Sequence, residues 1–481
     1  MVFNNCFYNA NSKVVCVDNE RLALLQFKQD LRDPANRLSS WVGENCCKWM
    51  GVICDNVTGR VSEIHLRNPY IKPVGDYETK AESESEYESE IDAYWRSQLR
   101  GKISPALLNL NHLEHLDLSC NHFEGIKIPG FIGSLKNLRY LNLSQSNFGG
   151  VIPYQLGNLS RLRYLSLDVA GASAENLQWL SGLPLLKHLV MSGVNLSKAF
   201  DWLKVTNNLP SLVELYLSNC ELTYIPHLPN INFTSLAILD LSSNNFETMQ
   251  PGGIFSLGSL VSLDLSFCQL YGSIPAVLRN MTSLRDLNLY YNYFNSTIPN
   301  WLYGFSHLEF LNFGFNSLQG ELSSDVKNLT SLGSIDLSYN QLEGTLPRSW
   351  GKLCNLKRTD FKRNKFGGDL SQVLKSFSGC ISNRLEWLNL RLNEFLGHLP
   401  DQLGQFRNLV YFSLSYNSIS GPIPVSIGRL SSLTILDLSF NQLNGTLPQS
   451  VGQLAKLREL RISRNLLEGV VSEFTSLISQ H

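Results

Sequence analysis

"SLTILDLSFNQLNGTLPQSVGQL" occupies residues 432–454, and residues 331–353 read almost the same, as SLGSIDLSYNQLEGTLPRSWGKL. In the first stretch Leu436 and Leu438 alternate with Asp437 and Ser439. This period of two predicts a short strand that turns the leucines toward a core and the polar pair outward. The fold therefore depends on how often the chain repeats this sequence pattern.

The repeat is regular along almost the whole chain. Alignment on the leucine that opens each Leu-x-x-Leu-x-Leu segment gives eleven steps of 24 residues and three steps of 25, 26 and 29 residues. Val61, with Ile64 and Leu66, opens one earlier unit, so the sequence predicts sixteen units. The aligned leucines are Leu113, Leu138, Leu162, Leu186, Leu212, Leu236, Leu260, Leu284, Leu308, Leu332, Leu356, Leu385, Leu409, Leu433 and Leu457.

An asparagine follows the predicted strand in ten units. We expect its amide to satisfy backbone groups of its own turn and of the adjacent unit. Cys220 and Cys268 take this place in two units, and we interpret both thiols as structural substitutes for asparagine. The asparagines are Asn121, Asn244, Asn292, Asn316, Asn340, Asn364, Asn393, Asn417, Asn441 and Asn465.

A single unit cannot fold alone, because its leucines line only one side of a coil. Stacking the units buries a continuous core, so the 481 residues form one elongated domain, although length alone suggests about three. We find no phosphate-binding loop, nucleophile elbow, kinase signature or His-Glu-x-x-His motif. His115 and His188 have no second ligand at a metal-like spacing. The sequence therefore predicts no enzyme, cofactor or metal site, and a net charge of −1 without a basic stripe of aromatic residues predicts no nucleic-acid partner.

The complete unit, L-x-x-L-x-L-S-x-N-x-L-x-G-x-I-P-x-x-L-G-x-L, resembles the plant-specific class of leucine-rich repeat over roughly residues 16–472. The irregular stretches NLQWLSGLP (176–184) and AFDWLKVTNNLP (199–210) resemble plant receptor-like proteins without a kinase, of the type that perceives fungal xylanase. This resemblance implies a leucine-rich repeat solenoid, an α/β-type right-handed superhelix with a parallel β-sheet on its concave face.

Residues 16–54, from CVDNERLALL to GVIC, resemble the amphipathic cap that precedes such repeats. Leu22, Leu24 and Phe27 suit a helix that covers the open end of the first coil. The resemblance also implies disulfides between Cys16 and Cys46 and between Cys47 and Cys54. We expect a leader remnant or disordered segment at 1–15, the cap at 16–60, repeats at 61–472 and a truncated tail at 473–481.

Cysteine pairs and nine Asn-x-Ser/Thr sequons predict a secreted or cell-surface protein, on the outer face of the plasma membrane in the full-length family. The chain as written shows no signal peptide and no membrane-spanning stretch, so we interpret it as truncated at its C-terminus. At Asn142, on a concave strand, we expect low glycan occupancy. The other sequons are Asn56, Asn158, Asn195, Asn232, Asn280, Asn295, Asn328 and Asn444.

Two features break the rhythm of the repeats. An acidic insertion at about 71–98 is interpreted as a solvated loop, with a lid that folds onto a basic ligand through Tyr77 and Tyr87 as the alternative. The unit with the 29-residue step contains Cys354 and Cys380. These two either bridge its longer loop or remain a pair of free buried thiols.

Recognition falls to the outward strand positions, because their side chains can change without disturbing the core. The later units carry basic and aromatic residues there, the types that dominate interface energetics. The candidate ligand-binding set is Arg358, Lys362, Trp387, Arg391, Tyr411 and Phe310. We expect the first four to contact an acidic protein or peptide. The aromatic residues that directly precede several of the asparagines are interpreted as a structural stripe.

The family resemblance implies the ligand-binding region of a plant receptor-like protein that recognises a microbial protein or peptide in defence. Without a kinase, such a chain signals through a kinase-bearing co-receptor. Two alternatives stay open at this point: a soluble inhibitor of a microbial wall-degrading enzyme, and a decoy or co-receptor scaffold that has no ligand of its own.

Overall fold

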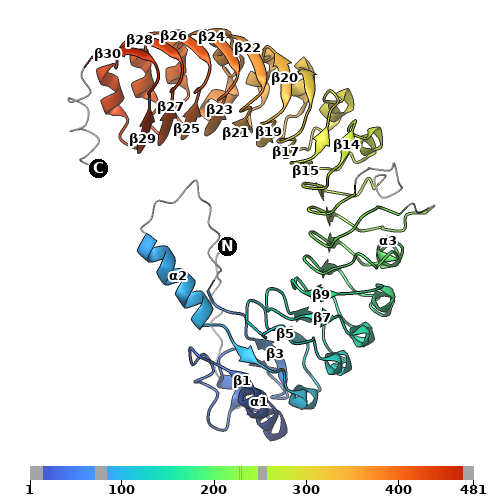
Figure 1. Cartoon of the computed structure of the whole chain (residues 1–481). Helices are drawn as coiled ribbons and strands as arrows, with labels where there is room; N and C mark the ends of the chain where they lie inside the picture. The colour runs from blue at the N-terminus through green and yellow to red at the C-terminus, as the bar shows by residue number, and fades with distance from the viewer. Residues whose placement is uncertain (1–14, 71–83, 227, 229, 247–256, 470–481) are drawn as a thin grey trace. The chain divides into compact units, whose positions relative to one another are not determined.

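The computed structural model describes residues 15–70, 84–226, 228, 230–246 and 257–469 (Figure 1). They divide into two compact units, which we describe separately. Unit 1 contains residues 1–222 and 232–236, and unit 2 contains residues 223–231 and 237–481. The expected leader remnant and truncated tail fall almost entirely outside the described residues.

The short strands predicted from the leucine pattern are present in both units. Unit 1 holds seven strands of the main sheet and unit 2 holds ten, and all but β2 run parallel, which gives one parallel strand for each of the sixteen predicted units. In unit 1 they are β2 (Val52–Cys54), β3 (Val61–His65), β5 (His115–Asp117), β6 (Tyr140–Asn142), β8 (Tyr164–Ser166), β10 (His188–Val190) and β11 (Glu214–Tyr216). In unit 2 they are β12 (Ile238–Asp240), β13 (Ser262–Asp264), β15 (Asp286–Asn288), β17 (Phe310–Asn312), β19 (Ser334–Asp336), β21 (Arg358–Asp360), β23 (Trp387–Asn389), β25 (Tyr411–Ser413), β27 (Ile435–Asp437) and β29 (Glu459–Arg461).

A second parallel sheet, which the sequence analysis did not predict, lies at the Gly-x-Ile-Pro segments of unit 2. Figure 1 shows its strands along the outer side of the coils and the main sheet along the inner, concave side. The glycine is needed at β26, because Gly421 has φ +77° and a Cβ there would lie 2.6 Å from Nδ1 of His398. The strands are β18 (Gln319–Glu321), β20 (Gln341–Gly344), β22 (Lys365–Asp369), β24 (Glu394–His398), β26 (Ser418–Gly421), β28 (Gln442–Thr446) and β30 (Leu466–Glu468).

Most of the described units return to the next strand through a short 3₁₀ helix. A proline often precedes this helix, as Pro424 does with φ −73°, which matches the backbone angle at a helix start. These helices include η2 (Pro105–Asn109), η4 (Tyr154–Asn158), η5 (Gln178–Gly182), η7 (Ala276–Asn280), η8 (Asn300–Gly304), η10 (Arg348–Lys352), η13 (Val425–Arg429) and η14 (Gln449–Gln453). The remaining short strands are β1 (Leu31–Arg32), β4 (Arg100–Gly101), β7 (Gly150–Val151), β9 (Ala172–Ser173), β14 (Tyr271–Gly272) and β16 (Tyr293–Phe294).

The asparagines form the predicted ladder between coils. Nδ2 of Asn340 donates to the carbonyls of Phe313, at 2.9 Å, and Leu337, at 3.1 Å, while its Oδ1 accepts from the Leu318 amide at 2.9 Å. The Cys268 thiol donates to the Leu241 carbonyl of the preceding coil at 3.2 Å. Cysteine therefore replaces asparagine as a donor, as the sequence predicted.

The polar partners of the inward leucines are less accessible than expected. Leu436 and Leu438 are each 1% exposed, as predicted, but Asp437 and Ser439 are also buried, at 2% and 6%. The Ser439 hydroxyl donates to the Asp437 carboxylate at 2.6 Å, and neighbouring coils cover both side chains. An outward strand position is therefore not by itself a binding position.

The N-terminal cap covers the first coil through α1 (Asp18–Asp30). Leu24 and Phe27 are fully buried there, whereas Leu22 is 54% exposed and Ala23 is buried instead. The disulfides Cys16–Cys46 and Cys47–Cys54 are present as the resemblance implied.

The acidic insertion contains a helix where the sequence analysis expected a loop. Helix α2 (Glu84–Arg96) ends against the body of unit 1, where Tyr94 is 3% exposed and its carbonyl accepts from Nδ2 of Asn68 at 3.0 Å. Tyr77 lies outside the described residues, and Tyr87 is described only as part of the helical backbone. The lid hypothesis is therefore untested.

The unit with the long step contains α4 (Leu370–Ser376) ahead of a short 3₁₀ helix, η11 (Cys380–Asn383), and is closed by a disulfide between Cys354 and Cys380. This decides between the two alternatives that the sequence left open. The irregular stretch at 199–210 likewise forms a true helix, α3 (Trp202–Thr206). Among the described helices, none has the length and apolar character that a membrane crossing requires.

Candidate ligand-binding surface

Three of the candidate residues form one stack on the concave face of unit 2. Arg358, Trp387 and Tyr411 are paired in register on the adjacent strands β21, β23 and β25. The Trp387 and Tyr411 rings lie parallel, with centroids 3.7 Å apart, and the Arg358 guanidinium lies 4.1 Å from the Trp387 ring centroid. The sequence predicted these residue types, and the register brings their side chains together.

Two further candidates flank this stack on the turns that follow the strands. Nζ of Lys362 lies 5.0 Å from the Tyr339 ring centroid, and the Arg391 guanidinium lies 5.1 Å from the Tyr416 ring centroid. In the described part of the chain, neither side chain forms an ion pair, and Arg358 forms none either. Three cations of the candidate set therefore have aromatic contacts but form no ion pair with a described residue.

Two buried donors at this surface also lack a partner. Nε1 of Trp387 and Nε of Arg391 are buried and make no hydrogen bond to any described residue. An unpaired buried donor costs free energy comparable to a lost hydrogen bond. An acceptor from outside the chain, such as a carboxylate or a backbone carbonyl, would remove that cost.

An aspartate below the stack makes the charge of this surface dependent on pH. Burial and the neighbouring Asp336 carboxylate raise the pKa of Asp360 to about 6. Its two oxygens accept from the Lys362 amide at 3.1 Å and from Nδ2 of Asn389 at 3.0 Å. Below pH 6 the protonated Asp360 no longer offsets the positive charge of Lys362.

Phe310 does not join the stack. It lies on β17, and Ser334 of β19 separates it from Arg358 in the register of the sheet. The candidate surface is therefore five residues on the coils of β21, β23 and β25, with Phe310 beside it.

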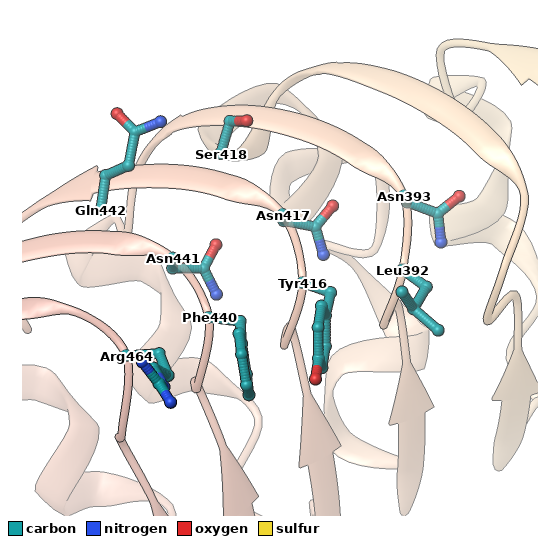
Figure 2. Close-up of a pocket in the computed structure, with 9 residues that line it drawn as sticks. All are labelled: Leu392, Asn393, Tyr416, Asn417, Ser418, Phe440, Asn441, Gln442 and Arg464. Atoms are coloured by element: carbon teal, nitrogen blue, oxygen red, sulfur yellow. The ribbon is translucent and has the colours of Figure 1, made fainter.

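A shallow groove of about 590 Å³ runs along the edge of the same unit, at the turns after β23, β25, β27 and β29. Figure 2 shows the Tyr416 and Phe440 rings side by side between Leu392 and Arg464. The two rings are parallel, with centroids 4.0 Å apart. Its lining residues are Leu392, Asn393, Tyr416, Asn417, Ser418, Phe440, Asn441, Gln442 and Arg464.

The aromatic residues before the asparagines, together with Phe267 before Cys268, stack on one another, which supports their interpretation as a structural stripe. The Phe315 and Tyr339 rings have centroids 3.9 Å apart, and Phe267 stacks on Tyr291 at 4.8 Å. All adopt positive φ, between 52° and 55°, a strained region for aromatic residues. Phe267 and Tyr291 nevertheless remain 45% and 48% exposed, so the stripe also presents an apolar edge.

Unit 1 carries a second column of rings that the sequence analysis missed. On the strands β5, β6 and β8, His115 stacks on Tyr140 with centroids 4.0 Å apart, and Tyr140 stacks on Tyr164 at 4.3 Å. His65 on β3 continues the column, with its ring 4.2 Å from that of His115. The signal was the aromatic or histidine residue that opens β5, β6 and β8.

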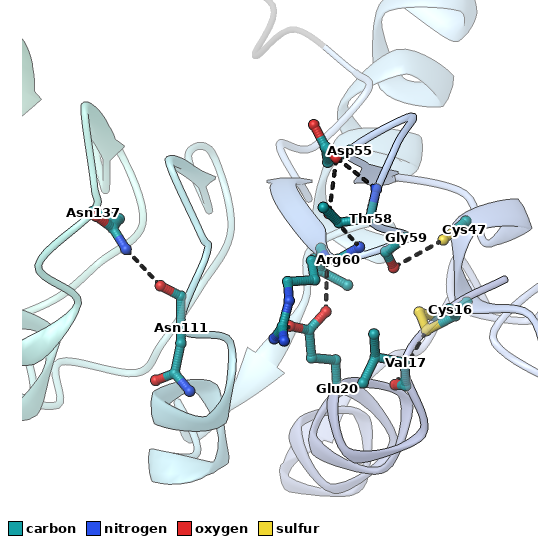
Figure 3. A network of polar contacts seen from close by, with 12 residues as sticks. Cys16, Val17, Glu20, Cys47, Asp55, Thr58, Gly59, Arg60, Asn111 and Asn137 are labelled. Carbon is teal, nitrogen blue, oxygen red and sulfur yellow. Dashed lines mark hydrogen bonds and ion pairs between the residues drawn. A yellow bond between two sulfur atoms is a disulfide. The ribbon is translucent and has the colours of Figure 1, made fainter. Parts of the chain in front are cut away.

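A hollow of about 550 Å³ lies between α1 and η2 in unit 1. Glu20 and Arg60 both line this hollow. Figure 3 shows the two side chains next to each other, and the Arg60 guanidinium lies 3.6 Å from a Glu20 oxygen. The other Glu20 oxygen accepts from the Val61 amide at 2.7 Å. This buried carboxylate joins the cap to the first strand of the repeats.

Family models match both the N-terminal cap and the repeats. The family model described as "Leucine rich repeat N-terminal domain" matches residues 17–55. Two models described as "Leucine rich repeat" match residues 107–169, 206–270 and 383–443, and residues 283–305 and 331–353. These matches agree with the parallel strands and with the asparagine ladder. The chain is a leucine-rich repeat protein.

Among curated proteins, this leucine-rich repeat protein is similar to two from tomato (Solanum lycopersicum). Receptor-like protein EIX1 is 39% identical over 245 residues, which are 49% of this chain and 22% of EIX1. Receptor-like protein EIX2 is 39% identical over 242 residues, with the same shares. The matched region thus spans about a fifth of each relative.

Solved structures of plant receptor ectodomains share the fold. The leucine-rich repeat ectodomain of the Arabidopsis receptor kinase HAESA, in complex with an N-terminally extended IDA peptide hormone, is 27% identical with a TM-score of 0.69, covering 95% of this chain and 75% of that one. A TDR receptor structure is 26% identical with a TM-score of 0.54, covering 78% and 76%.

Proposed function

We propose that this leucine-rich repeat protein is the extracellular ligand-binding region of a plant cell-surface receptor-like protein that recognises a microbial protein or peptide in defence. The stack of Arg358, Trp387 and Tyr411 on the concave face carries the proposal. The similarity of the chain to the tomato receptor-like proteins and to a peptide-bound receptor ectodomain supports the same role.

The chemistry of the surface favours an acidic segment as the ligand. Arg358, Lys362 and Arg391 offer unpaired positive charge, and the free donors of Trp387 and Arg391 require acceptors. A carboxylate of the ligand would meet charge and donors at once, and charge-assisted hydrogen bonds are about twice as strong as neutral ones. The flat Trp387 and Tyr411 pair gives an adjacent apolar contact for the peptide backbone.

The proposal includes a second protein for signalling. A kinase-bearing co-receptor would bind the ligand-loaded chain. The exposed aromatic stripe and the groove beside Tyr416 and Phe440 are available for that contact, since they lie at the edge of the sheet and not on its concave face.

The proposal is tested with the full chain and an array of synthetic peptides of about 15 residues, graded from acidic to basic, together with a purified fungal xylanase. We expect acidic peptides to bind and the double variant Arg358→Glu, Arg391→Glu to weaken binding by at least about tenfold. Arg429→Glu, on η13, is the matched control and leaves affinity unchanged. Equal affinity of the wild type and the double variant would refute the proposed surface.

The alternatives give different results in the same assay. A xylanase that binds the chain and keeps its activity supports a receptor, whereas loss of the xylanase activity supports an inhibitor. A chain that binds neither the peptides nor the xylanase supports the scaffold without a ligand and counts against the proposal.

A further inference from the structure

In unit 1 the side chains of Glu63, His65 and His115 lie close together, as the ligands of a metal ion do. Glu63 and His65 are two positions apart on β3, so they lie on the same face of the sheet, and His115 of β5 is paired with Glu63 in the register. One potential ligand atom from each residue, a carboxylate oxygen and two imidazole nitrogens, lies within 4.8 Å of the others. Two histidines and a glutamate from adjacent strands thus meet at one point.

His115 is held in place and has a vacant nitrogen. Its ring lies between those of His65 and Tyr140, with an interplanar angle of 4° to Tyr140. Nε2 of His115 is buried and has no hydrogen-bond partner among the described residues. A neutral imidazole nitrogen without a partner in a fixed ring is the donor that a metal ion requires.

The nearby Asp117 carboxylate does not extend into the point where the three side chains meet, because it is bound elsewhere. Asp117 pairs with His65 in the register of the strands, but one of its oxygens accepts from both the amide and the hydroxyl of Ser119, at 2.9 and 2.6 Å. Among the described residues, no backbone amide donates to the Glu63 carboxylate. Its carboxylate lies 2.6 Å from Nε2 of His65, and the two side chains are 38% and 40% exposed.

We propose that Glu63, His65 and His115 form a binding site for a divalent transition-metal ion, with Zn²⁺ as the favoured ion. Two imidazoles and one carboxylate suit zinc, copper and nickel rather than calcium or magnesium, which prefer oxygen ligands alone. Tetrahedral zinc places its ligand atoms about 3.4 Å apart, so atoms within 4.8 Å need only small side-chain rotations. Glu63 and His65 are exposed enough to make them.

Three protein ligands leave the fourth zinc position open toward the concave face. A carboxylate, imidazole or thiolate from a second molecule could complete the coordination there. The site is separate from the Arg358 surface, which lies in the other unit, so it does not depend on the proposed function.

The test is a calorimetric titration of the untagged full chain with ZnCl₂ and, in parallel, with MgCl₂. We expect one zinc ion per chain with a dissociation constant on the order of 1 µM, and no heat with magnesium. His65→Ala and His115→Ala should each weaken zinc binding by at least about tenfold. His115→Phe, which keeps a ring stacked on Tyr140, should weaken it equally and separates ligand loss from misfolding.

His188→Ala is the matched control, because His188 lies at the other end of the same column. Among the described residues its one ion pair is with Glu214, at 2.9 Å. This variant should bind zinc as the wild type does. The proposal is overturned if the folded wild type shows no zinc binding at about 1 mM, if His115→Phe binds with wild-type affinity, or if His188→Ala loses affinity as strongly as His115→Ala.

Discussion

The Arg358 guanidinium lies over the indole ring of Trp387, 4.1 Å from its centroid, on neighbouring strands of unit 2. Since the aromatic residue fixes the cation in place, we expect Trp387→Leu to weaken binding of an acidic peptide chosen from the array by about tenfold or more. Trp301→Leu, at a tryptophan on η8, should leave affinity unchanged. Fluorescence anisotropy measures both, and equal affinities for the two variants would contradict the role of the stack.

Arg37 joins the cap to the repeats and should be important for stability. Its guanidinium donates to Oδ1 of Asn121 at 2.9 Å, to the Ser97 carbonyl at 3.0 Å and to the Leu66 carbonyl at 2.9 Å. Removal of the guanidinium leaves these acceptors without a donor in a largely buried site. We therefore expect Arg37→Ala to lower the free energy of unfolding by about 3 kcal/mol.

Chemical denaturation of the whole chain measures this change. Arg21→Ala is the comparison, since Arg21 pairs at 3.3 Å with Asp18, which is 82% exposed, and such a pair contributes less than about 1 kcal/mol. A similar loss in both variants would show that Arg37 acts as an ordinary surface cation.

Asp360 should make stability fall as pH rises. Its pKa of about 6 in the folded chain, raised first by burial, exceeds the ordinary value of 3.8, so the folded state binds more protons than the unfolded state between those values. The free energy of unfolding therefore decreases from about pH 4 to pH 6, by up to about 3 kcal/mol from this group. Asp360→Asn should gain stability relative to the wild type over the same window.

The measurement is denaturant unfolding of both proteins at several pH values from 4 to 7. The difference between the two is informative because other carboxylates titrate equally in both. If that difference stays constant with pH, Asp360 does not keep its proton in the folded chain.

The disulfide between Cys354 and Cys380 closes a loop with a sequence separation of 26 residues. From the loop-closure entropy of a chain of that length, we expect Cys354→Ser with Cys380→Ser to lower the free energy of unfolding by about 3 to 4 kcal/mol. Cys120→Ser, at a free cysteine, is the control. Thermal unfolding of the three proteins under oxidising conditions compares them, and a double variant as stable as the control would contradict this role.

Asn142 should have low glycan occupancy, unlike an exposed sequon. It is 7% exposed on β6, and its Oδ1 accepts from the amide and hydroxyl of Ser144 at 3.0 and 2.7 Å. Asn444 is exposed on β28 and should be occupied. Glycopeptide mass spectrometry of the chain secreted from plant cells reads both sites, and a largely glycosylated Asn142 would be incompatible with the stacked Tyr140 and Tyr164 column beside it.

The sequence predicted what depends on residues within one unit or on its nearest neighbour. The buried leucines, the asparagine ladder and the thiol of Cys268 follow from positions that recur every 24 residues. The candidate stack was found for the same reason, because Arg358, Trp387 and Tyr411 occupy one position in three successive units. Phe310 occupies that position too, but its neighbour Ser334 interrupts the row.

What escaped prediction depends on geometry between coils or on weak local patterns. The outer sheet is built from short glycine-containing segments such as Ser418–Gly421, which show no apolar alternation. Helix α2 lies in a run of acidic residues that suggested a solvated loop. His65 and His115 are separated in sequence by that insertion, so no spacing rule could connect them, and burial of Asp437 arises only once adjacent coils are in place.

The parallel register of the concave strands also sets a length scale for whatever lies across them. Successive strands of a sheet are about 4.8 Å apart, whereas an extended peptide advances about 3.3 Å per residue. Two coils therefore span nearly the same distance as three residues of such a peptide. A peptide that crosses Arg358, Trp387 and Tyr411 would therefore place every third residue over an equivalent position of every second coil. The spacing of the strands favours ligands whose contacting side chains recur every three residues.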